Sequence, residues 1–245
     1  MQHSALINVM IAAARKASRA LKRDFGEVEN LQVSLKGPGN FVTAADRKAE
    51  ETLKAELAKA RPGYSFLGEE SGTTSGTDTT HTWIVDPLDG TTNFLHGIPQ
   101  FAISIGLERS GTIVAGVIYN PITDELFVAE RGKGAFLNDK RLRVASRKQL
   151  ADSVIACGLP HLGRGDLDLG LRELRAIQDK VAGLRRFGAA ALDMAFVAAG
   201  IIILREAGGF VTDIDGADAM FTKKHVVAGN ETIQRELQTL LKAAS

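Results

Sequence analysis

Five short apolar segments follow one another closely between residues 82 and 138, and they constrain the fold more than any other feature of the sequence. These segments are 82–86, 101–108, 112–120, 125–130 and the weaker 134–138. Turn-forming residues fill the short connections between them, such as ERSG, NPIT and RGKG. Strands that are joined by such short turns pair in antiparallel fashion. The middle of the chain therefore predicts an antiparallel sheet.

Two helices are predicted before this sheet. The first has an apolar stripe with helical spacing, made of Leu6, Val9, Met10, Ala13, Ala17 and Leu21. After a break at 35–40 (LKGPGN), Thr43 is expected to cap a second helix, which the RPG at 61–63 ends. Its apolar stripe is Ala45, Ala49, Leu53 and Leu57. Residues 64–68 look like a strand, and the polar residues 71–80 predict a mobile loop.

The second half of the chain alternates between predicted strands and helices. We expect strands at 153–159, 209–213 and 225–229, and helices at 168–180, 188–200 and 230–242, the last capped by Asn230. Closely spaced strands after two helices predict an α+β fold, and the helix–sheet–helix–sheet–helix order of the whole chain suggests a layered sandwich. We expect a single unit over residues 1–245, with halves at about 1–145 and 146–245 and no flexible linker.

Composition excludes several classes of protein. The formal net charge is +1, so the total charge does not indicate binding to nucleic acid or to an anionic membrane. No apolar run is long enough to span a membrane, and the N-terminus lacks the form of a signal peptide. Cys157 is the single cysteine, which excludes a disulfide within the chain and favours a cytoplasmic location. Its apolar surroundings predict a buried hydrophobic residue rather than a nucleophile.

The five histidines are scattered, so a zinc site is not expected, and any metal should be a hard cation held by carboxylates. Asp86 and Asp89 provide such carboxylates, in the stretch DPLDGTT after an apolar strand. Pro87 should end that strand at Asp86, and Gly90 should turn the chain. The amides of Gly90 and Thr91 then lie at a helix start, where phosphate binds readily. Carboxylates for Mg²⁺ beside amides for phosphate indicate a site for a phosphate ester and its metal.

A plain turn is the alternative explanation, because Asp and Gly are common turn residues. Two further acidic groups favour the metal site. Glu69 and Glu70 follow the strand-like segment 64–68, although a solvated loop would also explain them. Asp46 lies in the first turn of the second predicted helix, where the helix dipole favours its charge. A water held by a metal, Thr91 and Asp46 would be a good nucleophile.

The motifs that carry this chemistry resemble those of a known family. NFVTAADRKAE, GEES, WIVDPLDGTTNF and RRFGAAALDMAFVAAG with REAGGFVTD are similar to the inositol monophosphatase family of Mg²⁺-dependent phosphatases. The resemblance runs from about Leu6 to Leu241, and the bacterial form is the most similar. It implies a layered α-β-α-β-α sandwich of the inositol monophosphatase and fructose bisphosphatase type. It also implies a cytoplasmic, lithium-sensitive homodimer.

The resemblance also implies roles for individual residues. The metal ligands would be Glu69, Asp86 and Asp89, with the carbonyl of Leu88. Thr91 and Asp46 would orient the attacking water, and Glu69 is also counted among the catalytic groups.

The substrate would meet a second set of residues. The amides of Gly90 and Thr91 would hold the phosphate beside Leu88, and Arg185, Gly188 and Ala189 would border the alcohol part of the substrate. Lys36 would lie near a third, weaker metal position.

The implied reaction is in-line attack on a phosphate monoester by metal-activated water. Aspartyl-phosphate chemistry is a weak rival, because its motif is D-x-D-G-T and the spacing here is one residue longer. Inositol monophosphate is the leading substrate. Histidinol phosphate, fructose bisphosphate and nucleoside bisphosphate are alternatives within the same fold. A non-catalytic factor that associates with RNA polymerase and the transcription machinery is the alternative of another class.

One stretch departs from the family pattern. After residues 196–200 (FVAAG) the family continues with a strand, a loop and a Trp-Asp pair, whose aspartate ligates a second metal and contacts a substrate hydroxyl. Here FVAAG runs directly into IIILREAGG, and Trp83 is the only tryptophan. Either a mobile segment is left out of the printed sequence, or the chain truly lacks it. We expect the first: two separate helices with a mobile segment between Gly200 and Ile201, whose Cα atoms would then lie clearly more than about 3.8 Å apart.

Overall fold

An eight-stranded sheet forms the centre of the first half of the computed structural model, in the order β10-β9-β8-β7-β6-β5-β3-β4. Its strands are β3 (Tyr64–Gly68), β4 (Gly72–Thr74), β5 (Asp78–Asp89), β6 (Ala102–Arg109), β7 (Thr112–Asn120), β8 (Glu125–Glu130), β9 (Gly134–Leu137) and β10 (Lys140–Arg141). The structure describes residues 3–25, 33–37, 40–159, 165–196, 200–223 and 225–244. The predicted antiparallel pairing is confirmed from β5 to β9, whereas β3 and β5 are parallel, so the sheet is mixed.

The polar residues 71–80 are not a loop throughout, as the sequence analysis expected. β4 pairs with β3, and β5 already begins at Asp78. Backbone hydrogen bonds impose this structure on a polar sequence: the amide of Asp78 donates to the carbonyl of Gly63 over 2.7 Å, and the amide of Gly76 donates to Ser65 Oγ over 3.1 Å. Apolar alternation does not reveal a strand at the edge of a sheet, because neither of its faces needs to be buried.

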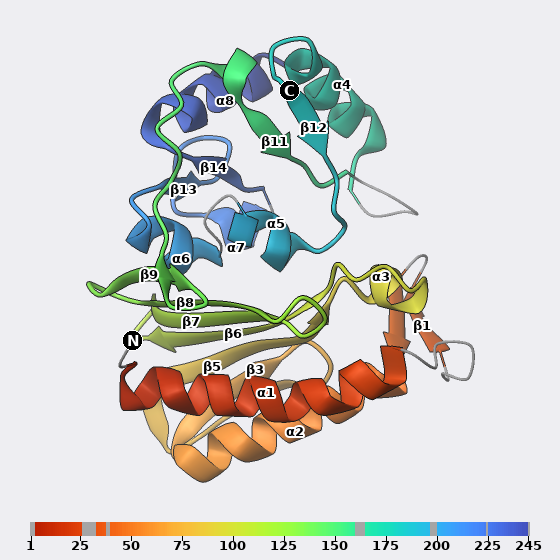
Figure 1. Ribbon diagram of the computed structural model, residues 1–245, viewed down its shortest axis with the longest axis vertical. Helices are drawn as coiled ribbons and strands as arrows, with labels where there is room; N and C mark the ends of the chain where they lie inside the picture. Colours follow the sequence, from red (N-terminus) through yellow and green to blue (C-terminus); the bar gives the residue numbers. More distant parts are fainter. Residues whose placement is uncertain are drawn as a thin grey trace.

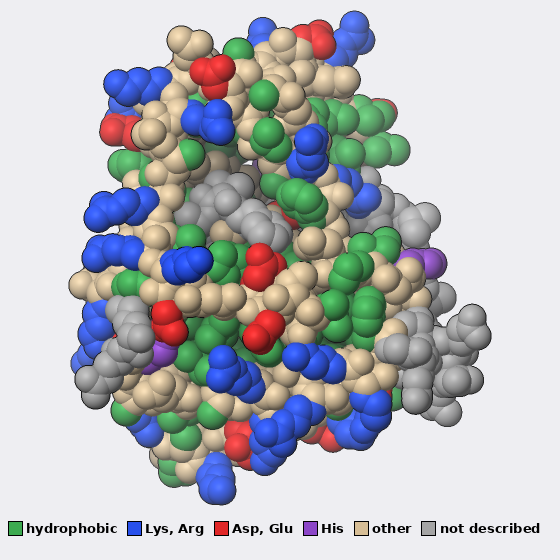
Figure 2. All heavy atoms as spheres, in the orientation of Figure 1, with side chains coloured by type: hydrophobic (Ala, Val, Ile, Leu, Met, Phe, Trp, Pro, Cys, Tyr) green, Lys and Arg blue, Asp and Glu red, His purple; other side chains and the backbone are tan. Residues whose placement is uncertain are grey.

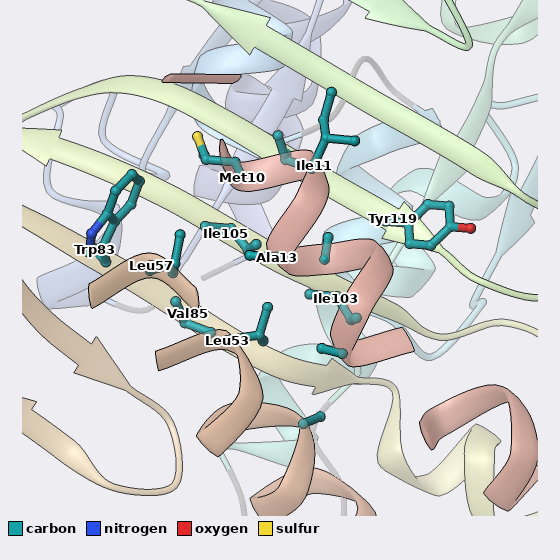
Figure 3. Close-up of a cluster of buried hydrophobic side chains, with 14 of the residues drawn as sticks. Met10, Ile11, Ala13, Leu53, Leu57, Trp83, Val85, Ile103, Ile105 and Tyr119 are labelled. Atoms are coloured by element: carbon teal, nitrogen blue, oxygen red, sulfur yellow. The ribbon is translucent and has the colours of Figure 1, made fainter. Parts of the chain in front are cut away.

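Helices α1 (Ala5–Phe25) and α2 (Ala44–Ala60) cover one face of the sheet (Figure 1). The predicted stripes face the sheet: their residues are buried, except that Leu6 and Val9 are partly buried. Figure 3 shows Leu53 and Leu57 beside Val85 and Ile105 of the strands. The start of α2 at Ala44 agrees with the predicted boundary at Thr43. The expected break at 35–40 instead contains parts of a two-stranded hairpin, β1 (Val33–Gly37) and β2 (Asn40–Thr43).

Short helices cover the opposite face of the sheet. These are α5 (Ala190–Phe196) and α6 (Gly200–Glu206), and their buried side chains include Leu192, Ile203 and Leu204. The predicted helix 188–200 is therefore shorter than expected.

A second strand layer lies above these short helices (Figure 1). It holds the parallel pair β11 (Val154–Ala156) and β12 (Gly183–Arg185) and the antiparallel pair β13 (Phe210–Thr212) and β14 (Val227–Gly229). The outermost layer contains α4 (Leu167–Gln178) and α8 (Glu231–Ala244), with a buried core that includes Ile177, Val227 and Ile233. Smaller helical pieces are α3 (Thr91–Leu95), η2 (Leu150–Asp152) and α7 (Met220–Lys223). This order confirms the expected α-β-α-β-α sandwich.

Two local predictions in the second half have different outcomes. Asn230 caps α8, because its Oδ1 accepts a hydrogen bond from the amide of Ile233 over 3.0 Å. Cys157 is half-buried rather than buried, and its Sγ lies 3.5 Å from the carbonyl oxygen of Arg185. Within the described ranges, no helix combines the length and the apolar character needed to cross a membrane.

The junction at Gly200 resolves the two explanations given above. The flanks form separate helices, as predicted, because α5 ends at Phe196 and α6 begins at Gly200. The expectation of a missing mobile segment between Gly200 and Ile201 is wrong, since both are consecutive residues of α6. Residues 197–199 lie outside the described residues. The sequence at this junction contains no Trp-Asp pair.

Candidate active site

Asp86 and Asp89 lie at the carboxyl end of β5, where the pairing with β6 shifts register. Asp86 pairs with Ser104 and Asp89 with Ala102, so three steps along β5 oppose two along β6. Such a bulge redirects side chains and accommodates a proline within a strand. The prediction that Pro87 ends the strand is therefore wrong, because β5 continues to Asp89. Asp86 Oδ1 accepts the amide of Leu88 over 3.0 Å, which holds this carboxylate against the bulge.

Glu69 joins the two aspartates because β3 and β5 are parallel. Gly68 pairs with Val85 at the ends of these strands, and the amide of Glu69 donates to the carbonyl of Val85 over 3.1 Å. The residues that follow two adjacent parallel strands meet at one edge of a sheet. Three predicted metal ligands therefore come from one edge, which an antiparallel pairing of β3 and β5 would have separated.

Burial and neighbouring negative charges both act on the pKa values of these carboxylates. Burial raises the pKa of Asp86 well above its usual range, and the negative charges of Asp89 and Glu69 raise it further. Burial likewise raises the pKa of Asp89 to about 6, with the nearby charges of Asp193 and Glu69 acting in the same direction and the amides of Ala191 and Ala190 opposing them. Carboxylates in such a cluster repel each other until a proton or a cation neutralises them.

Asp46 and Thr91, the two residues expected to orient the attacking water, are in direct contact. Thr91 Oγ1 lies 3.2 Å from Asp46 Oδ1 and 3.1 Å from the carbonyl oxygen of Leu88. Asp46 is 2% exposed and lies in the first turn of α2. The first turn of α2 and the start of α3 therefore meet at the edge where β5 ends.

The residues expected around the substrate lie where the two halves of the chain meet. Asp89 accepts the amide of Ala190 over 3.2 Å and the amide of Ala191 over 2.6 Å. Gly90 is in the left-handed region, with φ 93°, and an added Cβ would lie 3.1 Å from the Cβ of Ala189. The structure therefore brings Gly90 and Ala189 together although 98 residues separate them in the sequence.

Asn93 holds this junction and was missed by the sequence analysis. Its Nδ2 donates to the carbonyl of Gln100 over 2.7 Å and to the carbonyl of Phe187 over 2.6 Å. A Cβ added to Gly188 would lie only 3.1 Å from that nitrogen, so Gly188 leaves room for the amide. The signal in the sequence was weak: one Asn after the Gly-Thr-Thr turn, with partners up to 94 positions away.

Asp193 is a second residue that the sequence analysis did not select. Burial raises its pKa to about 6, while the amide of Phe187 and the charge of Arg186 lower it. Its Oδ1 is buried and has no hydrogen-bond partner among the described residues. Because the charge of Asp193 also acts on Asp89, it belongs to the same electrostatic cluster.

For two predicted residues, Arg185 and Lys36, the structure describes no contact with the carboxylate cluster. Arg185 is exposed at the end of β12, and its guanidinium donates to the carbonyl of its neighbour Leu184 over 2.8 Å. The adjacent Arg186 is the arginine whose charge acts on Asp193. The side chain of Lys36, expected near a third metal position, lies outside the described residues.

A cavity of about 420 Å³ adjoins the carboxylates. Glu69 and Asp86 line it together with apolar residues of the sheet and of the helices above, including Met194, Ile202 and Ile203. Figure 2 shows acidic and hydrophobic side chains side by side in the middle of the face that it presents. The cluster is thus reached from a hollow between the first sheet and the short helices.

The oxygen atoms of the cluster suit Mg²⁺, although they are not yet arranged around one point. In the part of the chain that the structure describes, no three Asp, Glu, His or Cys side chains already surround one point. The carboxylate of Asp89 is directed toward α5 instead, because both of its oxygens accept hydrogen bonds from amides of that helix. The cluster still offers only carboxylate and carbonyl oxygens, the ligands that a hard cation prefers. A cation would also relieve the repulsion that raises the pKa values of Asp86 and Asp89.

Comparisons with known proteins agree with this geometry. The family described as "Inositol monophosphatase family" matches residues 2–201. An inositol-1-monophosphatase from Mesorhizobium japonicum is 60% identical, over 99% of this chain and 98% of that protein. The Nus factor SuhB of Pseudomonas aeruginosa is 38% identical, over 96% of this chain and 95% of that protein. The crystal structure of the extragenic suppressor protein suhB from Bartonella henselae has a TM-score of 0.95 and 57% identity, and the match covers 98% of this chain and 99% of that one.

The same comparisons bear on the junction after α5. The alignment with the Mesorhizobium protein spans 260 positions, more than the 245 residues of this chain, so that relative has residues without a counterpart here. The family match also stops at residue 201, next to the point where the Trp-Asp pair was expected. Both findings agree with a chain that lacks this segment. The match nevertheless extends over most of the sequence and includes every carboxylate of the cluster, and the chain belongs to the inositol monophosphatase family.

Proposed function

We propose that this protein is a Mg²⁺-dependent phosphoric monoester hydrolase that acts on inositol monophosphate or a similar small phosphate ester. The observation that carries the proposal is the buried cluster of carboxylates beside the contact between Thr91 Oγ1 and Asp46 Oδ1, which are 3.2 Å apart. Glu69, Asp86 and Asp89, with the carbonyl of Leu88, would hold the metal. The family relationship supports both the chemistry and the metal.

The residues of this chain divide the reaction among them. Bound Mg²⁺ would supply positive charge for the phosphate and lower the pKa of a nearby water. Thr91 Oγ1 is within hydrogen-bond distance of Asp46 Oδ1 (3.2 Å) and of the Leu88 carbonyl oxygen (3.1 Å). With the hydroxyl proton directed to Asp46, the lone pairs of Thr91 would accept a hydrogen bond from the attacking water. As the new P–O bond forms and the ester P–O bond breaks, one water proton passes through Thr91 to Asp46. The ester oxygen leaves with the bonding electron pair and takes a proton from solvent water to become the alcohol.

The amides of Gly90 and Thr91 would hold the phosphate, since they start α3 beside the bulge. The backbone of Gly188 and Ala189 and the side chain of Arg185 would border the alcohol. Because the chain lacks the Trp-Asp pair, a second metal would have one ligand fewer. We therefore expect a higher Mg²⁺ requirement than in relatives that carry this aspartate, and inhibition by Li⁺ as in the family.

A phosphate-release screen tests the proposal. The panel contains inositol 1-phosphate, histidinol phosphate, fructose 1,6-bisphosphate and a nucleoside 3′,5′-bisphosphate, each with Mg²⁺ and with EDTA. Release from inositol 1-phosphate that EDTA abolishes is the expected result. Faster release from another ester would reassign the substrate within the fold. The absence of Mg²⁺-dependent release from every ester would overturn the proposal.

The relatives named Nus factor SuhB support a second candidate, association with RNA polymerase. Their identity to this chain is lower than that of the inositol-1-monophosphatase, so we rank this candidate second. A pulldown of RNA polymerase with the wild type and with Asp89→Asn separates the two, because binding should not depend on the metal ligand. We also propose a cytoplasmic homodimer; light scattering of the purified protein measures the oligomeric state.

A further inference from the structure

A second buried carboxylate lies one helical turn after Asp46 on α2. Glu50 is 3% exposed, which is rare for a glutamate unless its charge is compensated. Its Oε2 accepts the amide of Glu70 over 2.8 Å, and its Oε1 accepts the amide of Ser71 over 2.8 Å. Both oxygens are thus engaged by consecutive backbone groups of the turn that follows β3.

Gly68, on the other side of this turn, is shaped for the same carboxylate. A Cβ built on Gly68 would lie 2.4 Å from Glu50 Oε2, closer than real Cβ atoms approach another atom. A side chain at position 68 would therefore displace the carboxylate. These contacts explain the Gly-Glu-Glu-Ser sequence of the turn. The glycine leaves room for the Glu50 carboxylate, and the amides of Glu70 and Ser71 donate hydrogen bonds to it.

Glu69 lies between these contacts. Glu50 touches the residue before it and binds the residue after it, while the amide of Glu69 itself is bound to the carbonyl of Val85. The backbone of Glu69 is therefore fixed from both sides, and its side chain is left to enter the carboxylate cluster with Asp86.

Two residues of the helix α2 thereby contact two different segments of the site. Asp46 contacts Thr91, and Glu50 binds the turn of Glu69. Four residues of an α-helix rise by about 6 Å, and positions i and i+4 lie on the same face. The rigid spacing between Asp46 and Glu50 on α2 sets the spacing between Thr91 and the turn that carries Glu69.

We propose that Glu50 is a positioning residue that holds Glu69 in the geometry for metal binding. The proposal rests on the proposed function only in taking Glu69 as a metal ligand. Both oxygens of Glu50 accept amides of the turn, those of Glu70 and Ser71, and Glu50 is not among the residues assigned to the metal. Residues that orient metal ligands typically change metal affinity by about 10- to 100-fold when they are replaced.

The test compares two variants of α2: one replaces a carboxylate oxygen of the buried Glu50, and the other makes the same change at an exposed neighbouring residue. Glu50→Gln keeps the shape but offers only one acceptor to the two amides. Glu51→Gln makes the same chemical change at the next residue of α2, which is exposed. Mn²⁺ binding by isothermal titration and electron paramagnetic resonance needs no substrate. We expect Glu50→Gln to raise the Mn²⁺ dissociation constant about 10-fold or more, and Glu51→Gln to leave it unchanged.

Two further readouts separate positioning from a general loss of structure. Hydrogen exchange should accelerate in the peptide that contains residues 69–72 and not in the strands β6 and β7. In the phosphatase assay, the Mg²⁺ concentration for half-maximal rate should rise about 10-fold, while kcat at saturating Mg²⁺ stays near that of the wild type. Equal loss of kcat at all Mg²⁺ concentrations, with unchanged Mn²⁺ affinity, would overturn the proposal.

Glu69→Gln distinguishes the failure of this proposal from the failure of the proposed function. If Glu69→Gln leaves Mn²⁺ binding intact, Glu69 is not a ligand and the metal assignment fails. If Glu69→Gln weakens binding but Glu50→Gln does not, the metal assignment stands and the positioning role is wrong. Gly68→Ala gives an independent route, because its methyl group displaces the Glu50 carboxylate without removing its charge; we expect the same loss of Mn²⁺ affinity.

Discussion

Thr91 Oγ1 lies 3.2 Å from Asp46 Oδ1, and this contact joins the first turn of α2 to the start of α3. The hydroxyl has one proton to donate, and Asp46, 2% exposed, has little access to water. In the proposed mechanism, a proton of the attacking water would pass through the threonine to Asp46.

The two residues should act as one unit in catalysis. Thr91→Ala and Asp46→Asn each interrupt the same proton path, so each single variant should lower kcat by about 100-fold or more. The double variant should be little worse than the poorer single variant. Rate measurements at saturating Mg²⁺ complete this double-mutant cycle. Fully multiplicative losses would show that the two residues work separately.

Asp89→Asn should lower kcat/KM on the order of 100-fold or more, because a metal ligand loses its charge. The amide can still accept one hydrogen bond from α5, where the carboxylate accepts two. Unfolding by urea should therefore show a modest loss of stability beside the large loss of activity. Asp168→Asn, at an exposed aspartate in the first turn of α4, is the control: it should leave kcat/KM unchanged and lower stability by at most about 1 kcal/mol, because only a helix-dipole interaction is lost. Undiminished turnover in Asp89→Asn would remove Asp89 from the metal site.

Gly90→Ala tests the contact between the two halves of the chain. Gly90 has φ 93°, and an added Cβ would lie 2.9 Å from the carbonyl oxygen of Gln100. Backbone strain and overlap together should reduce the free energy of unfolding by about 2–4 kcal/mol. Gly97→Ala provides the matched control, since Gly97 has φ 68° and no atom within 4 Å of the added Cβ. It should cost about 1 kcal/mol, from the backbone alone. Equal losses for the two variants would exclude close packing at Gly90.

Asp78 should make the fold sensitive to acid. Hydrogen bonds from the hydroxyl and the amide of Thr80, with a smaller contribution from His81, lower the pKa of Asp78 from 3.8 to about 2. A carboxyl whose pKa is lower in the folded state stabilises the fold above pH 3.8, and this contribution disappears as the pH falls toward 2. The stability difference between the wild type and Asp78→Asn should therefore shrink between pH 5 and about pH 2. Urea titrations at several pH values measure it, and a constant difference would contradict the assignment.

Magnesium should stabilise the folded protein, because a cation at the cluster relieves the repulsion that raises the pKa of Asp86. The midpoint of thermal unfolding should rise with MgCl₂ and not with NaCl at the same ionic strength. Glu69→Gln should reduce this rise. A response to NaCl equal to that to MgCl₂ would indicate general screening instead of a site.

Short-range sequence patterns predicted many of the helices and strands and several residues of the candidate site. Helical stripes predicted α1 and α2, closely spaced strands predicted the antiparallel run from β5 to β9, and Asn230 marked the start of α8. Asp86, Asp89, Thr91 and Asp46 were selected from one compact motif and one helix start. These signals are readable because periodicity, caps and turns depend on neighbours within a few residues.

Other features were decided only when distant segments met. The parallel pairing of β3 with β5 brings Glu69 close to Asp86. The polar residues 72–74 form the strand β4 because they pair with β3 at the edge of the sheet. Asn93 reached Phe187, and Glu50 bound the amides of Glu70 and Ser71, through hydrogen bonds that span 94, 20 and 21 positions. The continuity of α6 across Gly200 and Ile201 likewise became visible only in the fold.

The sequence by itself thus determined the layers of the fold and the carboxylates that the candidate site contains. The tertiary structure decided which carboxylates share a space, which glycines admit a neighbour, and which buried residues hold the others in place. The physical reason is that a hydrogen bond or a charge interaction acts over a few ångströms in space, whereas the groups it joins can lie anywhere along the chain.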